Sequence, residues 1–250
     1  MKRLRLFIDI GHGWGNRKVG LFDPGATWKG KLLGFIRNCQ EYVFAKGLAY
    51  RLKAAFKGLP VDVYLNVGGD YRKRAAKADK WGADLLLSIH FNGNNVDGVE
   101  TFVHHQASAA SKKYQAEIHH RLVKALTPLR DRGRKRYGFA VLAGKCPAVL
   151  VETAGMNAKN LAVYEKAVGG VVTAIRDGVL AGAAIRTIPA AQVHVRTFKK
   201  VTIHCDAEDV AVYADLARQM GDAGRVEDTV AGSSKTWPGA ALYTTVEIRR

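Results

Sequence analysis

The sequence predicts an α/β protein, in which a twisted and mostly parallel β-sheet is flanked by helices and followed by a small C-terminal α+β appendage. Short apolar runs alternate with helical patterns up to about residue 184, and this alternation is typical of the crossover connections that join parallel strands. Beyond that residue the pattern changes to strand, helix and strand. We therefore expect two domains, a large one over residues 1–184 and a small one over residues 185–250.

The individual elements follow from the places where apolar residues cluster or recur with helical spacing. Strands are predicted at residues 4–10, 61–65, 84–90, 98–103 and 147–152, and helices at residues 36–57, 71–81, 108–126 and 159–182. The strand at 98–103 follows a turn rich in glycine and asparagine, which makes it a neighbouring or an edge strand. In the appendage, which is joined near Pro189, residues 193–205 and 241–249 alternate like strands and residues 207–220 repeat like a helix.

The chain carries a large excess of positive charge, with 39 Lys and Arg against 22 Asp and Glu and a net charge of +17. Such an excess predicts an anionic partner, whether nucleic acid, anionic lipid or an acidic polymer of the cell envelope. The densest basic cluster, RDRGRKRYG at 130–138, is either a phosphate-binding loop or a solvated loop beside a site. A nucleic-acid-binding protein is the non-enzymatic alternative, but most aromatic residues occupy core-type positions and no nucleic-acid motif is present.

The sequence offers no export segment and no cysteine framework. No apolar run approaches the ~20 residues that cross a bilayer, and Asp9 interrupts the basic N-terminus before an apolar export segment forms. Cys39, Cys146 and Cys205 lie far apart without a CxxC pair, which predicts neither a disulfide framework nor a cysteine zinc site. We therefore expect a protein that is made in the cytoplasm without a signal peptide and has reduced cysteines.

Two histidines stand where predicted strands end. The strand at 4–10 stops at Gly-His-Gly, which places His12 in a tight turn, and the strand at 84–90 ends on His90. Ligands of open α/β sheets gather beyond the carboxyl ends of the strands. Either histidine alone is as well explained by a turn or by a satisfied core residue, whereas two of them at one edge of a sheet indicate a functional site.

Two glutamates join these histidines. Glu152 ends the apolar run 148–151 and reaches the same edge of the sheet, where a capping or salt-bridged acid is the alternative. Glu41 shares a helical stripe with Ala45 and Leu48, so it is either a carboxylate that faces the core or an exposed acid of the first helical turn. Two histidines and one carboxylate form a three-ligand zinc site with an open position, and a further glutamate supplies a general base.

A series of sequence blocks occurs in an order that is specific to one enzyme family. The blocks are IDIGHG, FDPGAT, the helix with Glu41, YRKRAAKADKWGADLLLSIHFN, GVETFV, GFAVL and PAVLVETAGMNAKN. Over residues 1–182 the chain resembles the zinc-dependent N-acetylmuramoyl-L-alanine amidases, and more narrowly the amidase-3 catalytic domain of autolysins and endolysins. It departs from the family in a longer segment after His12, in Asp79 where asparagine is usual, and in TAGMN where an aromatic residue usually follows the glycine.

The resemblance implies a role for each candidate residue. The zinc ligands of the family fall on His12, Glu41 and His90, and its catalytic glutamate falls on Glu152. The implied cofactor is one catalytic Zn²⁺, and the implied substrate is peptidoglycan. The reaction that the resemblance implies is hydrolysis of the amide between N-acetylmuramic acid and the L-alanine of the stem peptide.

The expected biological role is that of a phage or prophage endolysin, which acts on the wall after release from the cytoplasm. A bacterial autolysin or remodelling amidase of the same chemistry is the alternative, although such an enzyme normally needs an export signal. The positive charge predicts attraction to acidic wall polymers or lipopolysaccharide, weakened by salt. The appendage either binds the wall, forms a homodimer or packs on the catalytic domain, and no specific nucleic acid is expected as a partner.

Overall fold

The structure, a computed structural model, describes residues 3–185, 200–206, 225–229 and 243–249. The chain divides into two compact units, residues 1–187 and 188–250. The described part of the second unit is an antiparallel sheet in the order β11-β13-β12, formed by β11 (Lys200–Asp206), β12 (Arg225–Thr229) and β13 (Tyr243–Arg249). β11 and β13 overlap the two predicted strands, whereas β12 was not predicted. The helix predicted at 207–220 lies outside the described residues.

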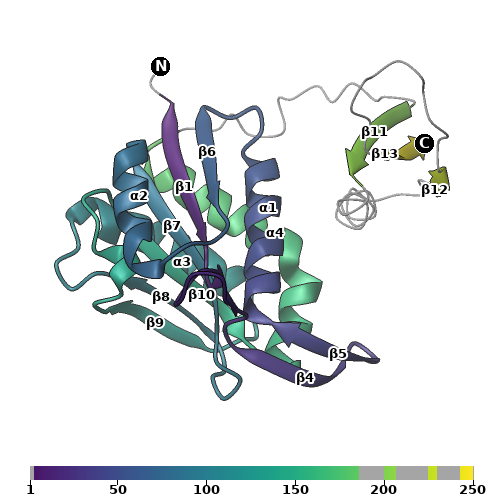
Figure 1. Ribbon diagram of the computed structural model, residues 1–250, viewed down its shortest axis with the longest axis horizontal. Helices are drawn as coiled ribbons and strands as arrows, with labels where there is room; N and C mark the ends of the chain where they lie inside the picture. The colour runs from purple at the N-terminus through teal and green to yellow at the C-terminus, as the bar shows by residue number, and fades with distance from the viewer. Residues whose placement is uncertain (1–2, 186–199, 207–224, 230–242, 250) are drawn as a thin grey trace. The chain divides into compact units, whose positions relative to one another are not determined.

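The first unit is built on a six-stranded sheet in the order β6-β1-β7-β10-β8-β9 (Figure 1). Its first four strands run parallel, whereas β8 pairs antiparallel with β10 and β9 pairs parallel with β8. The strands are β1 (Leu4–Ile10), β6 (Val61–Asn66), β7 (Leu85–Asn92), β8 (Val99–Val103), β9 (Asp131–Arg136) and β10 (Ala148–Gly155). The predicted α/β class with a mostly parallel sheet is confirmed.

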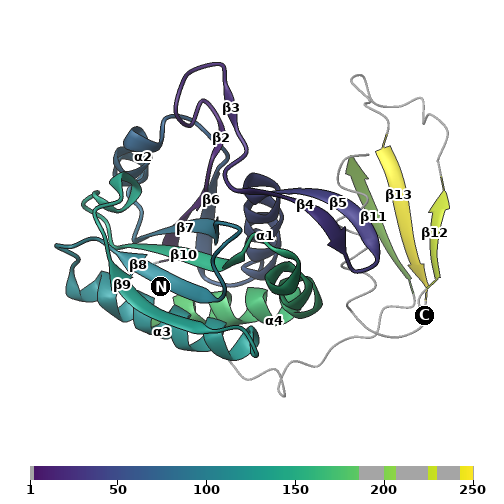
Figure 2. The same cartoon turned by 90° about the horizontal axis from the view of Figure 1, so that it is seen from below.

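Helices cover both faces of this sheet (Figure 2). One face packs against α1 (Glu41–Ala55), α3 (Ala109–Ala125) and α4 (Ala158–Gly182), and the other against α2 (Arg74–Trp81) and the 3-10 turn η2 (Ala140–Leu142). Leu6 and Ile8 of β1 enter the first core and Phe7 enters the second, because successive side chains of a strand point to opposite faces. None of the described helices is long and apolar enough to cross a membrane.

The helix predicted at residues 36–57 begins later than expected. Residues 36–40 belong to β5 (Phe35–Gln40), which pairs antiparallel with β4 (Thr27–Leu32) in a hairpin, and α1 starts at Glu41. A second, shorter hairpin joins β2 (Gly13–Trp14) to β3 (Phe22–Asp23) within the long segment that follows His12. The predicted helix includes residues 36–40 because helical spacing alone does not reveal their pairing with β4.

Both interpretations of the basic segment at 130–138 required a loop. The structure instead shows a strand there. Most of it forms β9, which lies at the edge of the main sheet (Figure 1). An edge strand keeps one side open to water and therefore tolerates a run of charged residues. The strand predicted at 98–103 is consequently an inner neighbour between β10 and β9 and not an edge.

Asp79 of α2 connects this helix to the segment that precedes β10. Its Oδ1 atom accepts the N–H of Cys146 at 2.8 Å, and its two oxygens lie 2.9 and 3.0 Å from the N–H nitrogen of Lys145. Burial alone would raise the pKa of Asp79, but these backbone donors outweigh that effect and hold the pKa below its usual range. The ionised carboxylate therefore stabilises the fold at a position where asparagine is usual in the family that the sequence resembles.

We expect Asp79→Asn to lower the free energy of unfolding by about 1 kcal/mol near neutral pH. Because the folded-state pKa is lowered, the contribution of Asp79 is present above the unfolded-state pKa of ~3.9 and is lost as the pH falls through the folded-state value. The difference between wild type and variant therefore shrinks in acid. Urea unfolding at neutral and acid pH measures it, with Asp62→Asn as the control, since Asp62 forms an exposed ion pair with Arg3. Equal effects of the two substitutions at neutral pH would contradict the role of Asp79.

Candidate metal centre

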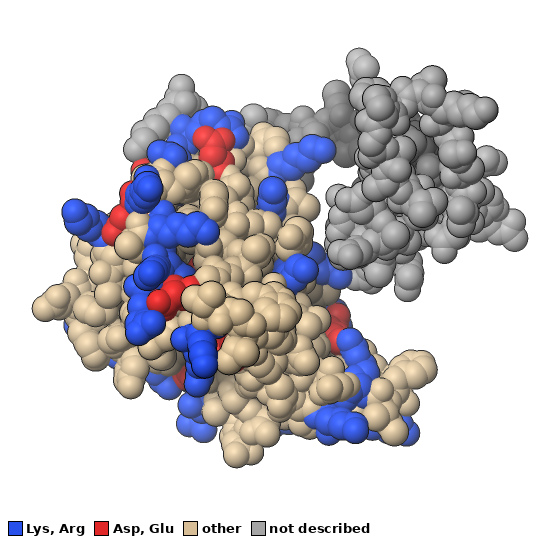
Figure 3. All heavy atoms as spheres, in the orientation of Figure 1, with Lys and Arg blue, Asp and Glu red and all other residues tan. Residues whose placement is uncertain are grey.

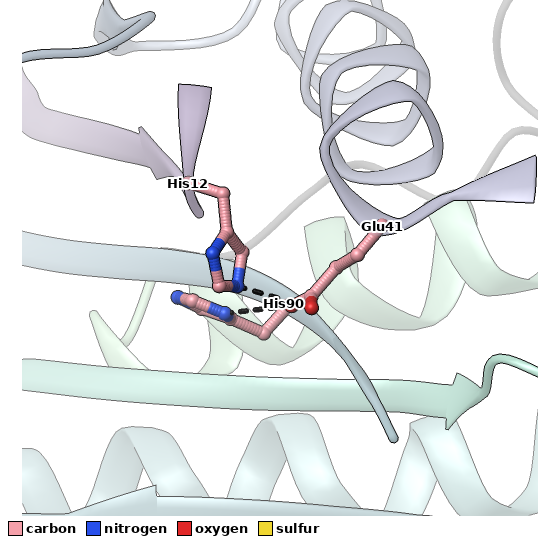
Figure 4. A group of neighbouring side chains, drawn as sticks. All are labelled: His12, Glu41 and His90. Carbon is pink, nitrogen blue, oxygen red and sulfur yellow. Dashed lines mark hydrogen bonds and ion pairs between the residues drawn. The ribbon is translucent and has the colours of Figure 1, made fainter. Parts of the chain in front are cut away.

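Three of the predicted site residues converge at the carboxyl edge of the parallel strands. His12 follows β1, His90 lies near the end of β7, and Glu41 is the first residue of α1. One candidate ligand atom from each residue lies within 4.8 Å of the other two. Figure 4 shows the two imidazole rings and the carboxylate pointing toward one another. Since β1 and β7 are adjacent in the sheet, residues that are distant in sequence meet at this edge.

The carboxylate of Glu41 bridges the two imidazole rings. Its Oε2 atom lies 3.0 Å from His12 Nε2, and its Oε1 atom lies 2.9 Å from His90 Nδ1. Two backbone groups orient it further, because the N–H of Ala26 donates to Oε2 and the N–H of Phe91 donates to Oε1. Burial alone would raise the pKa of Glu41, but its hydrogen bonds with His12 and His90 outweigh that effect and hold the pKa well below its usual range. Glu41 is thus an ionised side chain in a buried place.

His12 is held in an uncommon conformation and in one ring orientation. Its backbone φ is 64°, in the left-handed region that few residues other than glycine adopt. Its Nδ1 atom lies 3.1 Å from Asp23 Oδ2, so that Nε2 faces Glu41. Burial alone would raise the pKa of Asp23, but hydrogen bonds from Asn16 and Gly25 outweigh that effect and, with His12, lower the pKa to about 2. Such an outer carboxylate fixes which ring nitrogen is left for a metal ion.

Arg74 secures the backbone of the turn that carries His12. Its guanidinium donates to the carbonyl oxygens of Ile10 and His12, each at 2.6 Å, and to Asp9 Oδ1 at 3.0 Å. Arg74 and Asp9 are both buried, and Asp9 also accepts a hydrogen bond from Ser88 Oγ. Neither Asp23 nor Arg74 was singled out in the sequence. Asp23 lies in the FDPGAT block, but nothing in the sequence indicates that either residue contacts His12.

Glu152 lies beside this cluster on β10. It is in register with His90 of β7, and the two line one cavity of about 690 Å³ together with His12 and Glu41. The buried Oε2 atom of Glu152 has no hydrogen-bond partner in the described part of the chain. Burial, and then the nearby carboxylates of Glu41 and Glu100, raise the pKa of Glu152 well above its usual value. Glu152 is therefore a carboxyl group at the cavity that the described residues do not engage through Oε2.

The residues present fit a catalytic zinc ion. Two imidazole nitrogens and one carboxylate oxygen are donors that zinc takes in hydrolytic sites, where the fourth position stays open for water or substrate. The cavity adjoins all three donors and is also lined by Glu152, whose buried Oε2 atom has no hydrogen-bond partner among the described residues. Asp23 supplies the outer hydrogen bond that histidine ligands usually have. The structure therefore brings together all four residues that the sequence singled out.

Gly25 leaves room for two of the candidate ligands. Its φ is +70°, and a Cβ atom there would lie 2.5 Å from Glu41 Oε2 and 2.6 Å from His12 Cδ2. We expect Gly25→Ala to displace both side chains and to weaken zinc binding by about 10-fold or more. Gly20→Ala is the matched control, because Gly20 also has a positive φ of +77° but a Cβ atom there meets nothing within 4 Å. Competition with a chromophoric chelator measures both affinities, and equal affinities would refute this steric explanation.

Known proteins resemble the first unit in sequence. The sequence pattern of the Amidase_3 family, N-acetylmuramoyl-L-alanine amidase, matches residues 6–179. The sporulation-specific N-acetylmuramoyl-L-alanine amidase of Bacillus subtilis (strain 168) is 31% identical over 160 residues, which are 60% of this chain and 55% of that protein. LytC, an N-acetylmuramoyl-L-alanine amidase of the same organism, is 32% identical over 69% of this chain and 34% of its own length. The chain thus spans about half or less of these two relatives.

Solved structures share the fold as well. The N-acetylmuramoyl-L-alanine amidase of Clostridium difficile 630 superimposes with a TM-score of 0.61 at 26% identity, over 75% of this chain and 100% of that chain. The catalytic domain of the amidase CwlV from Bacillus (Paenibacillus) polymyxa var. colistinus gives a TM-score of 0.60 at 25% identity, over 73% of this chain and 99% of that chain. With the sequence pattern matched across almost the whole first unit, the chain belongs to the N-acetylmuramoyl-L-alanine amidase family.

Proposed function

We propose that this chain is a zinc-dependent peptidoglycan hydrolase, which cleaves the amide between N-acetylmuramic acid and the L-alanine of the stem peptide. One observation carries the proposal: His12, Glu41 and His90 meet in a cavity that Glu152 also lines, and the Oε2 atom of Glu152 has no hydrogen-bond partner among the described residues. Membership of the family supports the substrate class. The cavity, of about 690 Å³, is large enough for the peptide branch to enter beside these groups.

The side chains of the site have separate tasks in this reaction. His12, Glu41 and His90 would hold a zinc ion, which when bound would polarise the scissile carbonyl and lower the pKa of water toward ~7. Glu152 accepts the proton of the attacking water and returns it to the departing nitrogen of L-alanine. Asp23 keeps the His12 ring in place and Arg74 keeps its backbone in place, so that the ligands hold one geometry through the reaction.

Mass spectrometry of digested peptidoglycan tests this proposal. Purified sacculi are incubated with the full chain loaded with zinc, and the soluble products are analysed. The expected products are free stem peptides that begin with an unblocked L-alanine, together with glycan strands that have lost their peptides. Products cut within the stem peptide would show that the enzyme is a peptidase, and products cut between sugars would show that it is a glycosidase. Loss of activity on chelation and its return with added zinc test the metal requirement separately.

We further propose that the protein acts in lysis by a phage or prophage, made in the host cytoplasm and reaching the wall after release. The net charge of +17 supports contact with acidic wall polymers or lipopolysaccharide. Figure 3 shows Lys and Arg side chains spread over the face drawn, where Asp and Glu are few. A bacterial autolysin or remodelling amidase is the alternative. The gene neighbourhood decides between them, because genes for phage particles and membrane lesions beside this gene support the first, and ordinary bacterial genes support the second.

A further inference from the structure

A row of aromatic rings leads away from the cavity toward the edge of the sheet. Phe139 lines the cavity with His90 and Glu152, and its ring centroid lies 4.5 Å from that of Tyr137. The ring of Tyr137 lies 6.1 Å from that of His105. These separations are typical of rings in contact. Phe139, Tyr137 and His105 therefore form one continuous surface, called here the aromatic row.

The aromatic row is open to solvent where it leaves the cavity. Tyr137 is 54% exposed, and His105 is exposed as well. Phe139, at the other end, packs against Phe102 of β8 with ring centroids 5.3 Å apart. The aromatic row is thus packed against the protein at Phe139 and exposed to solvent at Tyr137 and His105, where a ligand can contact the rings.

The cations of β9 that point to the face of the aromatic row are paired, although β9 is basic. Lys135 and Arg132 point to this face, where both form ion pairs with the buried Glu100. Arg134 and Arg136 form no ion pair among the described residues, but alternation along the strand places them on the opposite face from Lys135. An aromatic surface whose neighbouring β9 cations are already paired favours a neutral polymer over a polyanion such as nucleic acid, whose binding depends on phosphate contacts.

We propose that the aromatic row binds the glycan strand of peptidoglycan, a polymer of N-acetylated amino sugars. The faces of such sugar rings present C–H groups, which stack on aromatic rings, and the strand carries the peptide as a branch. A strand that lies on Tyr137 presents a branch to the cavity at Phe139, where His90 and Glu152 are. The inference rests on the proposed function, because it states which part of the same substrate lies outside the cavity.

Binding of a hexamer of N-acetylglucosamine to the full zinc-loaded chain tests this proposal. This probe has no lactyl amide, so its binding is measured apart from catalysis, by isothermal titration calorimetry. We expect Tyr137→Ala to raise the dissociation constant about 10-fold, by analogy with other aromatic stacking surfaces, and Tyr137→Phe to change it less than about 2-fold because the ring remains. Tyr50→Ala is the matched control, since Tyr50 is 40% exposed on α1 and outside the cavity.

Each outcome decides for or against the aromatic row. Equal affinities of the wild type, Tyr137→Ala and Tyr50→Ala for the hexamer would overturn the proposal, as would the absence of hexamer binding in the wild type. If Tyr137→Ala weakens binding of oligodeoxythymidine and not of the hexamer, the row serves single-stranded nucleic acid instead. Digestion of sacculi by the wild type, run in parallel, decides the amidase function, so the two proposals fail independently. Circular dichroism confirms that the Tyr137 variants are folded.

Discussion

Glu152→Gln is expected to bind zinc like the wild type and to lose about 10²–10⁴-fold in the rate of release of stem peptides. The amide has nearly the shape of the carboxyl group but cannot take a proton from water. Its effect on folding is small, because the buried Oε2 atom of Glu152 has no hydrogen bond to lose within the described residues. Product release from purified sacculi measures turnover, and elemental analysis of the dialysed protein measures bound zinc.

Glu165→Gln is the matched control for this substitution. Glu165 lies on α4 outside the cavity, where its Oε1 atom forms an ion pair with Arg37 at 2.6 Å. The same acid-to-amide change there should leave turnover within about 2-fold of the wild type, since exposed ion pairs contribute little. If Glu152→Gln released stem peptides at a rate near that of Glu165→Gln, Glu152 would have no role in proton transfer.

His90→Ala is expected to lose both zinc and turnover. The substitution removes one of the three donors and leaves the Oε1 atom of Glu41 without its imidazole partner. The loss of zinc affinity should exceed the roughly 10–100-fold that follows removal of an outer hydrogen-bond partner of a ligand. Competition with a chromophoric chelator measures the affinity, and digestion of sacculi with excess zinc measures the remaining turnover.

His120→Ala controls for the loss of a histidine in itself. His120 lies exposed on α3, where its Nδ1 atom lies 2.9 Å from the carbonyl oxygen of Ala116 in the same helix. This variant should keep the zinc affinity and turnover of the wild type. Zinc affinity in His90→Ala equal to that of His120→Ala would mean that the metal is held elsewhere.

Most of the central sheet could be predicted because its inner strands are apolar runs in the sequence. The inner parallel strands β1, β7 and β10 are buried on both faces and therefore read as apolar runs, as in 84–90. β9 gives no such signal, because its sequence, DRGRKR, contains no apolar side chain. It forms a strand at the edge of the sheet through its pairing with β8. The start of α1 was equally hidden, because residues 36–40 pair with a strand that carries no strong apolar pattern of its own.

The candidate site could be predicted because strand ends of a parallel sheet meet at one edge. The two interpretations of Glu41 are both partly right: it is an acid of the first helical turn, and it is buried at 4% exposure against the two histidines. Asp23 and Arg74 could not be found in this way. Their partners are a ring nitrogen and a backbone oxygen of His12, and such contacts depend on packing that no local pattern records.

The order of the site residues along the chain has a consequence for synthesis on the ribosome. His12, Glu41 and His90 belong to β1, α1 and β7 or adjoin them, whereas Glu152 arrives with β10, the last parallel strand to be made. Domains fold progressively as the chain emerges. A nascent chain that ends after β7 thus contains the three candidate metal ligands but not Glu152, so under the proposed mechanism hydrolysis cannot begin before β10 is inserted beside β7.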